Sequence, residues 1–207
     1  MGNPVRTSTK FVAENARYVK INHGAVCAIA HRILASKLLI HGPQRQAKQR
    51  KIISAGNSQK EKLTFLFILD SVNFCFWSDT KKWRFVCNGK SYFGSIGSAY
   101  ALKKFFDENK KKTTLAYFAS IPYKEFCSIF EGEGKLLLMK ERWNCARELC
   151  RTLLEQYDGD IVGFVKSAYQ SASLLLNKIY LTLPYFADIH AYKETYGEQR
   201  RVWFLKR

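Results

Sequence analysis

The sequence predicts a mainly α-helical fold that carries one small antiparallel β-hairpin. Apolar residues recur at three- and four-residue steps in several stretches, which is the spacing of one face of an α-helix. The dipeptide Asn88-Gly89 stands between residues 83–87 and 90–93, and it is the strongest short hairpin signal because the favoured turn needs two positive φ angles. With 207 residues, 47% of them hydrophobic, the chain can bury a core and is expected to form a single domain over residues 1–207.

The N-terminal part predicts helices on either side of a loop. Two helices are expected over residues 11–19 and 25–40, with a break at residues 22–24. The polar, basic and glycine-containing residues 41–60 are expected to form a loop. Residues 63–77, LTFLFILDSVNFCFW, are almost unbroken in apolar character and long for a strand, so they predict a largely buried helix.

The chain after the hairpin predicts further helices. Residues 98–109 and 121–130 have the expected spacing, and the clearest pattern covers residues 141–157. Asp160 is placed to cap a following helix, which continues until Pro184 forbids it.

The six cysteines include no CxxC pair, and no cysteine and histidine cluster has the spacing of zinc ligands. The sequence therefore predicts reduced thiols and no metal site. Residues 1–20 have no apolar core of a signal peptide, and no apolar run reaches the length of a membrane span. We therefore expect a cytoplasmic protein that does not insert into a membrane.

The formal net charge of +17 is the one unusual feature of the composition. The positive charge is concentrated in residues 44–51, 81–82 and 110–112, each in a polar connector. Such runs are usually solvated loops or helix ends, which is the preferred interpretation. The alternative is an RNA-binding surface, in which these cations contact phosphates and aromatic rings stack on bases. The aromatic residues concerned are Trp83, Phe85, Tyr92 and Phe93.

Asp70 and Asn73 are the polar groups that stand out in the predicted helix of residues 63–77, where positions i and i+3 share one face. An unpaired buried charge is costly, so Asp70 would need hydrogen-bond donors, a cation or a ligand. Desolvation would raise its pKa into a useful range, which makes Asp70 the candidate catalytic carboxylate. The alternative is a structural role, in which Asp70 caps a neighbouring helix or pairs with Arg or Lys. The aromatic residues expected in the core nearby are Phe74, Phe76 and Trp77.

Six segments carry a resemblance through their order and spacing. They are ILDSVNFCFW (68–77), NGKSYFG (88–94), ERWNCARELCRTLLEQYDG (141–159), QSASLLL (170–176), LPYFAD (183–188) and RVWFLKR (201–207). From about Phe11 to the last residue, the chain resembles the queuosine salvage proteins, also called queuosine 5'-phosphate N-glycosylase/hydrolases. The resemblance implies a hydrolase that cleaves the N-glycosidic bond of queuosine 5'-phosphate and releases queuine for tRNA modification. It also implies a fold similar to helical DNA glycosylases and no cofactor.

Such a reaction passes through an oxocarbenium-like sugar, so the site needs a carboxylate, hydrogen bonds to the departing base and cations at the 5'-phosphate. The resemblance implies that Lys206 and Arg207, which match the basic pair of the family's aromatic-Lys-Arg motif, lie near the phosphate. Leu205 stands where the family has an aromatic residue. Together with Asn73, these two basic residues are the expected substrate-binding residues.

The resemblance also implies that the family's catalytic aspartate lies beyond the segment that matches Arg207. One alternative is therefore a shortened or degenerate family member without catalytic activity. Its exposed apolar face would be covered by a partner chain or by self-association. A basic RNA-binding module is the second alternative.

Overall fold

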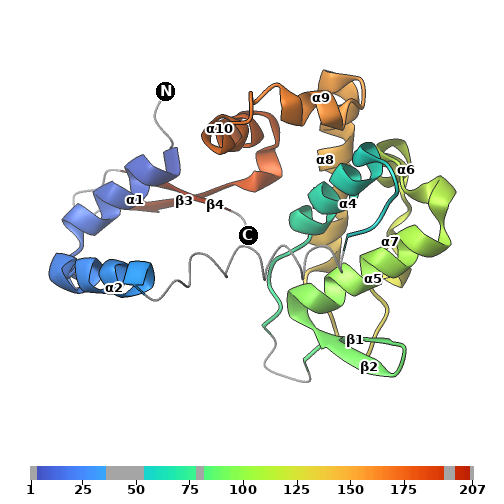
Figure 1. Cartoon of the computed structure of the whole chain (residues 1–207), viewed down its shortest axis with the longest axis horizontal. Coiled ribbons are helices and arrows are strands. Elements are labelled where there is room, and N and C mark those ends of the chain that lie inside the picture. The colour runs from blue at the N-terminus through green and yellow to red at the C-terminus, as the bar shows by residue number, and fades with distance from the viewer. Residues whose placement is uncertain (1–3, 36–53, 78–81, 194–198, 206–207) are drawn as a thin grey trace. The chain divides into compact units, whose positions relative to one another are not determined.

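A computed structural model of the chain describes residues 4–35, 54–77, 82–193 and 199–205 (Figure 1). The described chain is mainly α-helical and contains the expected hairpin, which confirms the predicted fold class. The chain divides into two compact units. One unit holds the described residues up to 35 together with residues 189–205, and the other holds residues 54–188. The single-domain organisation stays a prediction.

The first unit contains α1 (Pro4–Asn15), α2 (His23–Ala35) and most of a strand pair formed by β3 (Ala187–Lys193) and β4 (Gln199–Leu205). This second strand pair is an element that the sequence did not predict. The two predicted N-terminal helices exist, but both begin earlier than expected, and α2 ends at residue 35 within the described chain.

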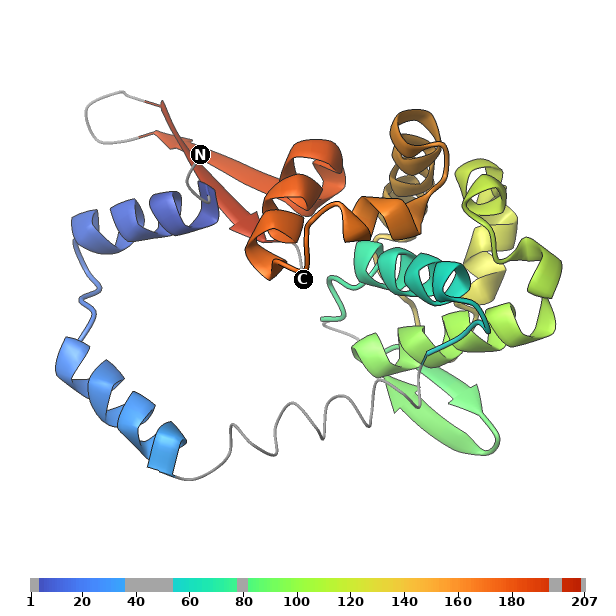
Figure 2. The same cartoon turned by 45° about the horizontal axis from the view of Figure 1, so that its top comes forward.

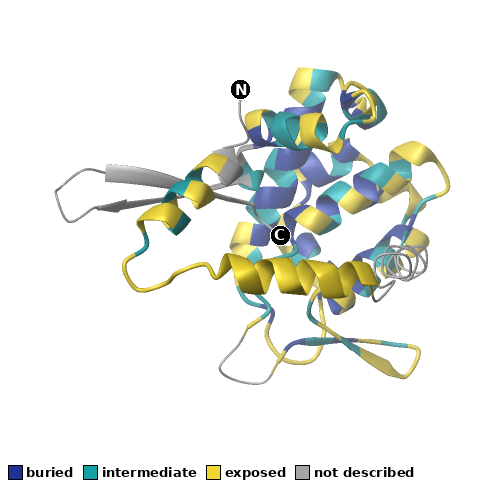
Figure 3. Cartoon of the chain, turned by 60° about the vertical axis from the view of Figure 1, so that its left-hand side comes forward, coloured by how far each residue is buried: buried dark blue, intermediate teal, exposed yellow. Residues whose placement is uncertain are grey.

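The start of α2 has a local cause, because the Asn22 side chain accepts a hydrogen bond from the Ala25 amide at 3.0 Å. Every residue of α2 is exposed, which Figure 3 shows along the whole helix. Of the predicted loop of residues 41–60, residues 41–53 lie outside the described residues.

The second unit begins with α4 (Gln59–Ser71), which starts inside the predicted loop. Its start is a capping box. The Ser58 hydroxyl accepts a hydrogen bond from the Glu61 amide, and the Glu61 carboxylate accepts one from the Ser58 amide. Hydrogen bonds from the backbone of Ser58 and Asn57 lower the pKa of Glu61. The predicted helix of residues 63–77 is therefore wrong at both ends, since residues 73–77 are not helical.

The hairpin is confirmed, with β1 (Arg84–Cys87) antiparallel to β2 (Lys90–Phe93) and Val86 opposite Ser91. Asn88 and Gly89 have φ angles of 49° and 70°, as the tight turn requires. The hairpin leads directly into α5 (Gly94–Glu108), which begins four residues before the predicted helix (Figure 2).

The remaining elements of this unit form a helical layer around α8. They are η1 (Lys110–Lys112), α6 (Leu115–Ser120), α7 (Tyr123–Ile129), α8 (Met139–Tyr157), α9 (Ile161–Lys166), α10 (Ala172–Thr182) and η2 (Pro184–Phe186). The short helix α6 was missed from the sequence. Helix α8 contacts α4, α6, α7 and α9 and so lies at the centre of the unit. Among the described residues, no helix is both long and apolar enough to cross a lipid bilayer.

The single helix predicted to follow Asp160 is wrong, because the chain forms α9 and α10 with a break between them. Asp160 does cap α9, since its side chain accepts a hydrogen bond from the Gly163 amide at 2.9 Å. Tyr169 and Gln170 then have positive φ angles of 49° and 59°, which an α-helix does not allow. Ser171 starts α10 by accepting a hydrogen bond from the Leu174 amide.

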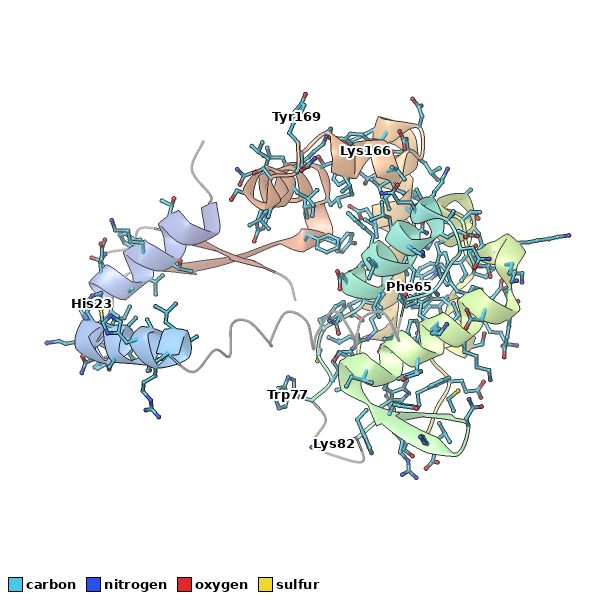
Figure 4. The ribbon with its side chains drawn as sticks, viewed as in Figure 1. His23, Phe65, Trp77, Lys82, Lys166 and Tyr169 are labelled. Carbon is cyan, nitrogen blue, oxygen red and sulfur yellow. The ribbon has the colours of Figure 1, made fainter. Side chains whose placement is uncertain are left out.

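The core of the second unit is an aromatic and aliphatic cluster in which α4, α5, α6 and α8 meet. The rings of Phe65 and Phe106 pack edge to face with centroids 5.3 Å apart, and Phe106 and Phe118 stack at 5.9 Å. Edge-to-face and stacked rings add roughly 0.5–1.5 kcal/mol each beyond the area they bury. Figure 4 shows Phe65 on the inner side of α4, among the side chains of its unit.

We predict that Gly97→Ala destabilises the second unit. A Cβ atom at this position would lie 2.6 Å from the Tyr92 carbonyl oxygen and 2.9 Å from the Trp83 ring, so the hairpin would have to move away from α5. The expected loss is about 1–3 kcal/mol in the free energy of unfolding, measured by urea titration. Ser95→Ala, at an exposed position of the same helix, is the control and should change this value by less than about 0.5 kcal/mol. Equal values for both variants would contradict the close packing of hairpin and helix.

Candidate functional site

Asp70 lies on the outer face of α4, in its last turn. Leu66 and Asp70 are four residues apart and both exposed, whereas Phe65, Ile68 and Val72 follow the inner face and are at most 1% exposed. The prediction that Asp70 is buried is therefore wrong. The apolar run suggested burial all round, but the helix uses only one of its faces for the core.

Asn73 follows the end of α4 and does not share a helix face with Asp70, which corrects the predicted i, i+3 arrangement. The backbone N–H of Asn73 donates a hydrogen bond to the backbone carbonyl oxygen of Asp70 at 3.3 Å, so the two residues belong to one turn. The side-chain oxygen Oδ1 of Asn73 is buried, and it has no hydrogen-bond partner among the described residues. An unsatisfied buried acceptor costs about 1–3 kcal/mol, so this atom is suited to receive a donor from a bound molecule.

Arg142 of α8 determines the path of the chain beyond α4. Its side chain is fully buried, and the two terminal nitrogens of its guanidinium donate hydrogen bonds to the carbonyl oxygens of Val72, Phe74 and Cys75. The bond to Cys75 is 2.9 Å long, and the Nε atom donates to the Leu137 carbonyl oxygen at 2.9 Å. The chain leaves the helical path here: the Val72 carbonyl accepts from Arg142 and from the Phe74 backbone amide at 3.1 Å, and the Phe74 and Cys75 carbonyls accept from Arg142.

The guanidinium of Arg142 also stacks on two rings. Its central carbon lies 4.6 Å from the ring centre of Phe74 and 4.9 Å from that of Phe76. Burial lowers the pKa of Arg142 to about 10, so the group keeps its positive charge at neutral pH. A buried cation over two aromatic faces gains more from the contact than an exposed one.

Arg142 is a site residue that reasoning from the sequence missed. The signal was present in the spacing, since Arg142, Ala146, Leu149 and Leu153 recur at three- and four-residue steps and all four are buried. An arginine in the apolar face of a predicted helix indicates a buried cation with specific acceptors.

The other predicted site residues have different outcomes. Phe74 and Phe76 are partly buried, whereas Trp77, which was expected in the core, is 87% exposed. Figure 4 shows the Trp77 ring directed away from the helices of its unit. Lys206 and Arg207 lie outside the described residues.

A separate cavity of about 530 Å³ lies between the hairpin and the connection from α7 to α8. Its walls include Trp83, Tyr123, Cys127, Glu131, Lys135 and Glu141. Neither Asp70 nor Asn73 lines it. Within the described residues, no group of three or more His, Cys, Asp or Glu side chains could hold a metal ion.

Of the four hairpin aromatics named for base stacking, only Phe93 is exposed, at 52%, so together they do not form a stacking platform. Trp83 and Phe85 are only 5% and 6% exposed, and the Trp83 ring nitrogen donates to the Phe130 carbonyl oxygen at 3.1 Å. Tyr92 is stacked on Tyr100. Residues 110–112 form an exposed turn of 3₁₀ helix, which agrees with the solvated interpretation and does not distinguish it from the RNA-binding alternative. Residues 44–51 lie outside the described residues.

We predict that Arg142→Met unfolds or strongly destabilises the second unit. The substitution removes the Arg142 donor from the partly buried carbonyl groups of Phe74 and Cys75, and one of the two donors from the buried Val72 carbonyl, at about 1–3 kcal/mol for each group that water does not reach. The expected loss exceeds about 3 kcal/mol in a denaturant titration. Arg151→Met, at an exposed position on the same helix, is the control and should cost much less. Similar stability of the two variants would contradict the role of this set of hydrogen bonds from Arg142, which we call the Arg142 clamp.

Comparisons with known proteins bear on this site. A sequence model of the family described as "Queuosine salvage protein" matches residues 53–207. A queuosine 5'-phosphate N-glycosylase/hydrolase of Sphaerobacter thermophilus is 31% identical over 199 residues, which are 96% of this chain and 58% of that protein. Proteins of the same name from Bos taurus and Schizosaccharomyces pombe are 29% and 28% identical, each over 98% of this chain. The chain spans about three fifths of the length of these curated relatives, with 59% and 61% of the latter two covered.

Proposed function

Because the chain belongs to the queuosine salvage protein family, we propose that it acts in the hydrolysis of the N-glycosidic bond of queuosine 5'-phosphate. The bond between C1′ of the ribose and the ring nitrogen of the base breaks, and the nitrogen keeps the electron pair. Water supplies a hydroxyl group to C1′ and a proton to the base. Queuine and ribose 5-phosphate are the products.

The family match over residues 53–207 is the observation that carries this proposal. It covers the whole second unit, including α4, the turn of Asp70 and Asn73, and the Arg142 clamp. The chain spans about three fifths of the relatives, so the proposal concerns the part of the site that these residues build.

Asp70 is proposed as the carboxylate that stabilises the cationic sugar. Its exposed position supports contact with a substrate that arrives from solvent. A proton-donating role would have been favoured by burial of the carboxyl group, so the exposed position does not support that role. A negative charge beside C1′ acts on the charge that develops in the transition state, which is the kind of interaction that accelerates the chemical step.

Asn73 is proposed to accept a hydrogen bond from an N–H group of the base. The buried, unpartnered Oδ1 atom supports this role, because a donor on the substrate would satisfy it. Arg142 supports the site indirectly by fixing the backbone on both sides of Asn73. Lys206 and Arg207 are proposed to contact the 5'-phosphate, on the basis of the family motif alone.

The proposed location is the cytoplasm, and no cofactor is proposed. The six cysteines are free thiols, which fits a reducing compartment. The comparisons do not favour RNA binding or a partner chain, and the buried Trp83 and Phe85 argue against base stacking on the hairpin.

The test is release of queuine from queuosine 5'-phosphate by the purified chain, followed by chromatography and mass spectrometry. We expect Asp70→Asn to lower kcat by roughly a hundred-fold or more, as for loss of one group that stabilises transition-state charge. Asp158→Asn is the matched control, because Asp158 is exposed with a φ of 50° that asparagine also accepts. No release by the folded wild-type chain would favour the shortened, inactive alternative.

Asn73→Ala separates a functional from a structural role. The variant removes a buried acceptor without a described partner, so its free energy of unfolding should be unchanged or higher than that of the wild type. Its KM should rise about ten-fold, as expected for one lost hydrogen bond of about 1.4 kcal/mol. A destabilised variant with unchanged KM would show that Asn73 serves the fold.

A further inference from the structure

Two arginines of α8 converge on one oxygen atom on the side of the helix that faces α6. The Nε atoms of Arg147 and Arg151 both donate to the Ala119 carbonyl oxygen, at 3.2 Å and 3.1 Å. Ala119 lies in the last turn of α6, where carbonyl groups have no partner within the helix. The two guanidinium groups are therefore held side by side, close enough to contact one small molecule together.

The pair carries two positive charges, and no carboxylate in the described part of the chain forms an ion pair with either. Burial, and then the charge of Arg151, lower the pKa of Arg147. Glu148 is the carboxylate next to Arg147 in sequence, and it interacts with Tyr185: burial, and then the charge of Glu148, raise the pKa of Tyr185. Like charges one helical turn apart repel each other, so a bound anion would stabilise this arrangement.

Arg147 is already ordered for binding. Its guanidinium carbon lies 4.3 Å from the ring centre of Trp143, and the Trp143 ring nitrogen donates to the Ile121 carbonyl oxygen at 2.8 Å. The Lys140 ammonium lies 4.1 Å from the centre of the same ring and adds a third positive charge to this face of α8. Side chains that are fixed before binding lose less entropy when a ligand arrives.

Each arginine also keeps donors to spare. In the hydrogen bonds found among the described residues, only the Nε–H group of each guanidinium is used. The terminal NH₂ groups are the ones that form paired hydrogen bonds with phosphate oxygens. Two guanidinium groups match the charge of a phosphate monoester, which approaches −2 at neutral pH, better than that of a diester, which is −1.

We propose that Arg147 and Arg151 form a binding site for a phosphate monoester or inorganic phosphate on the α6 and α8 face. This site is built from other residues than the turn of Asp70 and Asn73, and it does not depend on the proposed hydrolase activity. The ligand is recognised by its doubly charged phosphoryl group. A phosphodiester backbone such as that of RNA is the competing ligand, and the test separates the two.

The experiment is calorimetric titration of the full chain with inorganic phosphate and with ribose 5-phosphate, at constant ionic strength set with chloride. We expect saturable binding to the wild type and at least ten-fold weaker binding to the double variant Arg147→Gln and Arg151→Gln. Lys103→Gln with Lys104→Gln on α5 is the control, because it removes the same net charge from another helix. Its affinity for phosphate should equal that of the wild type.

Three outcomes would overturn the proposal. One is equal affinity of the wild type and the double glutamine variant, with circular dichroism showing that both are folded. The second is no saturable binding of either phosphate compound to the wild type. The third concerns an RNA oligonucleotide without a terminal phosphate. If the double variant binds this RNA ten-fold more weakly than the wild type does, but binds phosphate equally well, the pair is a contact for phosphodiesters. Arg147→Lys with Arg151→Lys should restore only part of the affinity, because lysine keeps the charge but loses the paired donors.

Discussion

The guanidinium of Arg142 is the group on which the local structure around the candidate site depends. A buried cation must find acceptors for its donors, and here the acceptors are carbonyl groups of residues 72, 74 and 75 together with Leu137. These bonds join the end of α4 to the start of α8, about 70 residues apart in sequence. They set the course of the segment that carries Asn73.

The clamp explains why an irregular segment can lie in a packed region. Backbone carbonyl groups outside regular structure need partners when water is excluded, and one arginine supplies three of them with hydrogen bonds while its faces contact Phe74 and Phe76. The rest of the second unit then follows from ordinary helix packing around α8. Rigid helices on both sides of an irregular turn are a suitable support for a binding site.

Some features that depend on local sequence were predicted, although the capping box of Ser58 and Glu61 was missed, and those that depend on distant contacts were not predicted. The hairpin at Asn88-Gly89 and the cap at Asp160 were predicted because a few adjacent residues determine them. The path of the chain beyond α4 was not, because it depends on Arg142. The break before α10 was missed as well, since positive φ angles at Tyr169 and Gln170 leave no signal in the residue types.

The same distinction holds for the candidate site. The apolar run correctly drew attention to the segment of Asp70 and Asn73, but hydrophobic content alone did not show that Asp70 faces solvent. The spacing of the apolar residues in α8 places Arg142 on their face, and this was the signal by which Arg142 could have been identified.

The exposed ring of Trp77 has a practical consequence for spectroscopy. The indole of Trp77 is 87% exposed, whereas that of Trp83 is 5% exposed, so the two report on different surroundings. An indole in water emits at longer wavelength and is reached by dissolved quenchers, whereas a buried one is shielded. Trp77 lies four residues after Asn73 and directly follows the clamped segment. Trp77 is one of four tryptophans in the chain, so its exposure makes it the indole beside the candidate site that a dissolved quencher reaches more readily than Trp83.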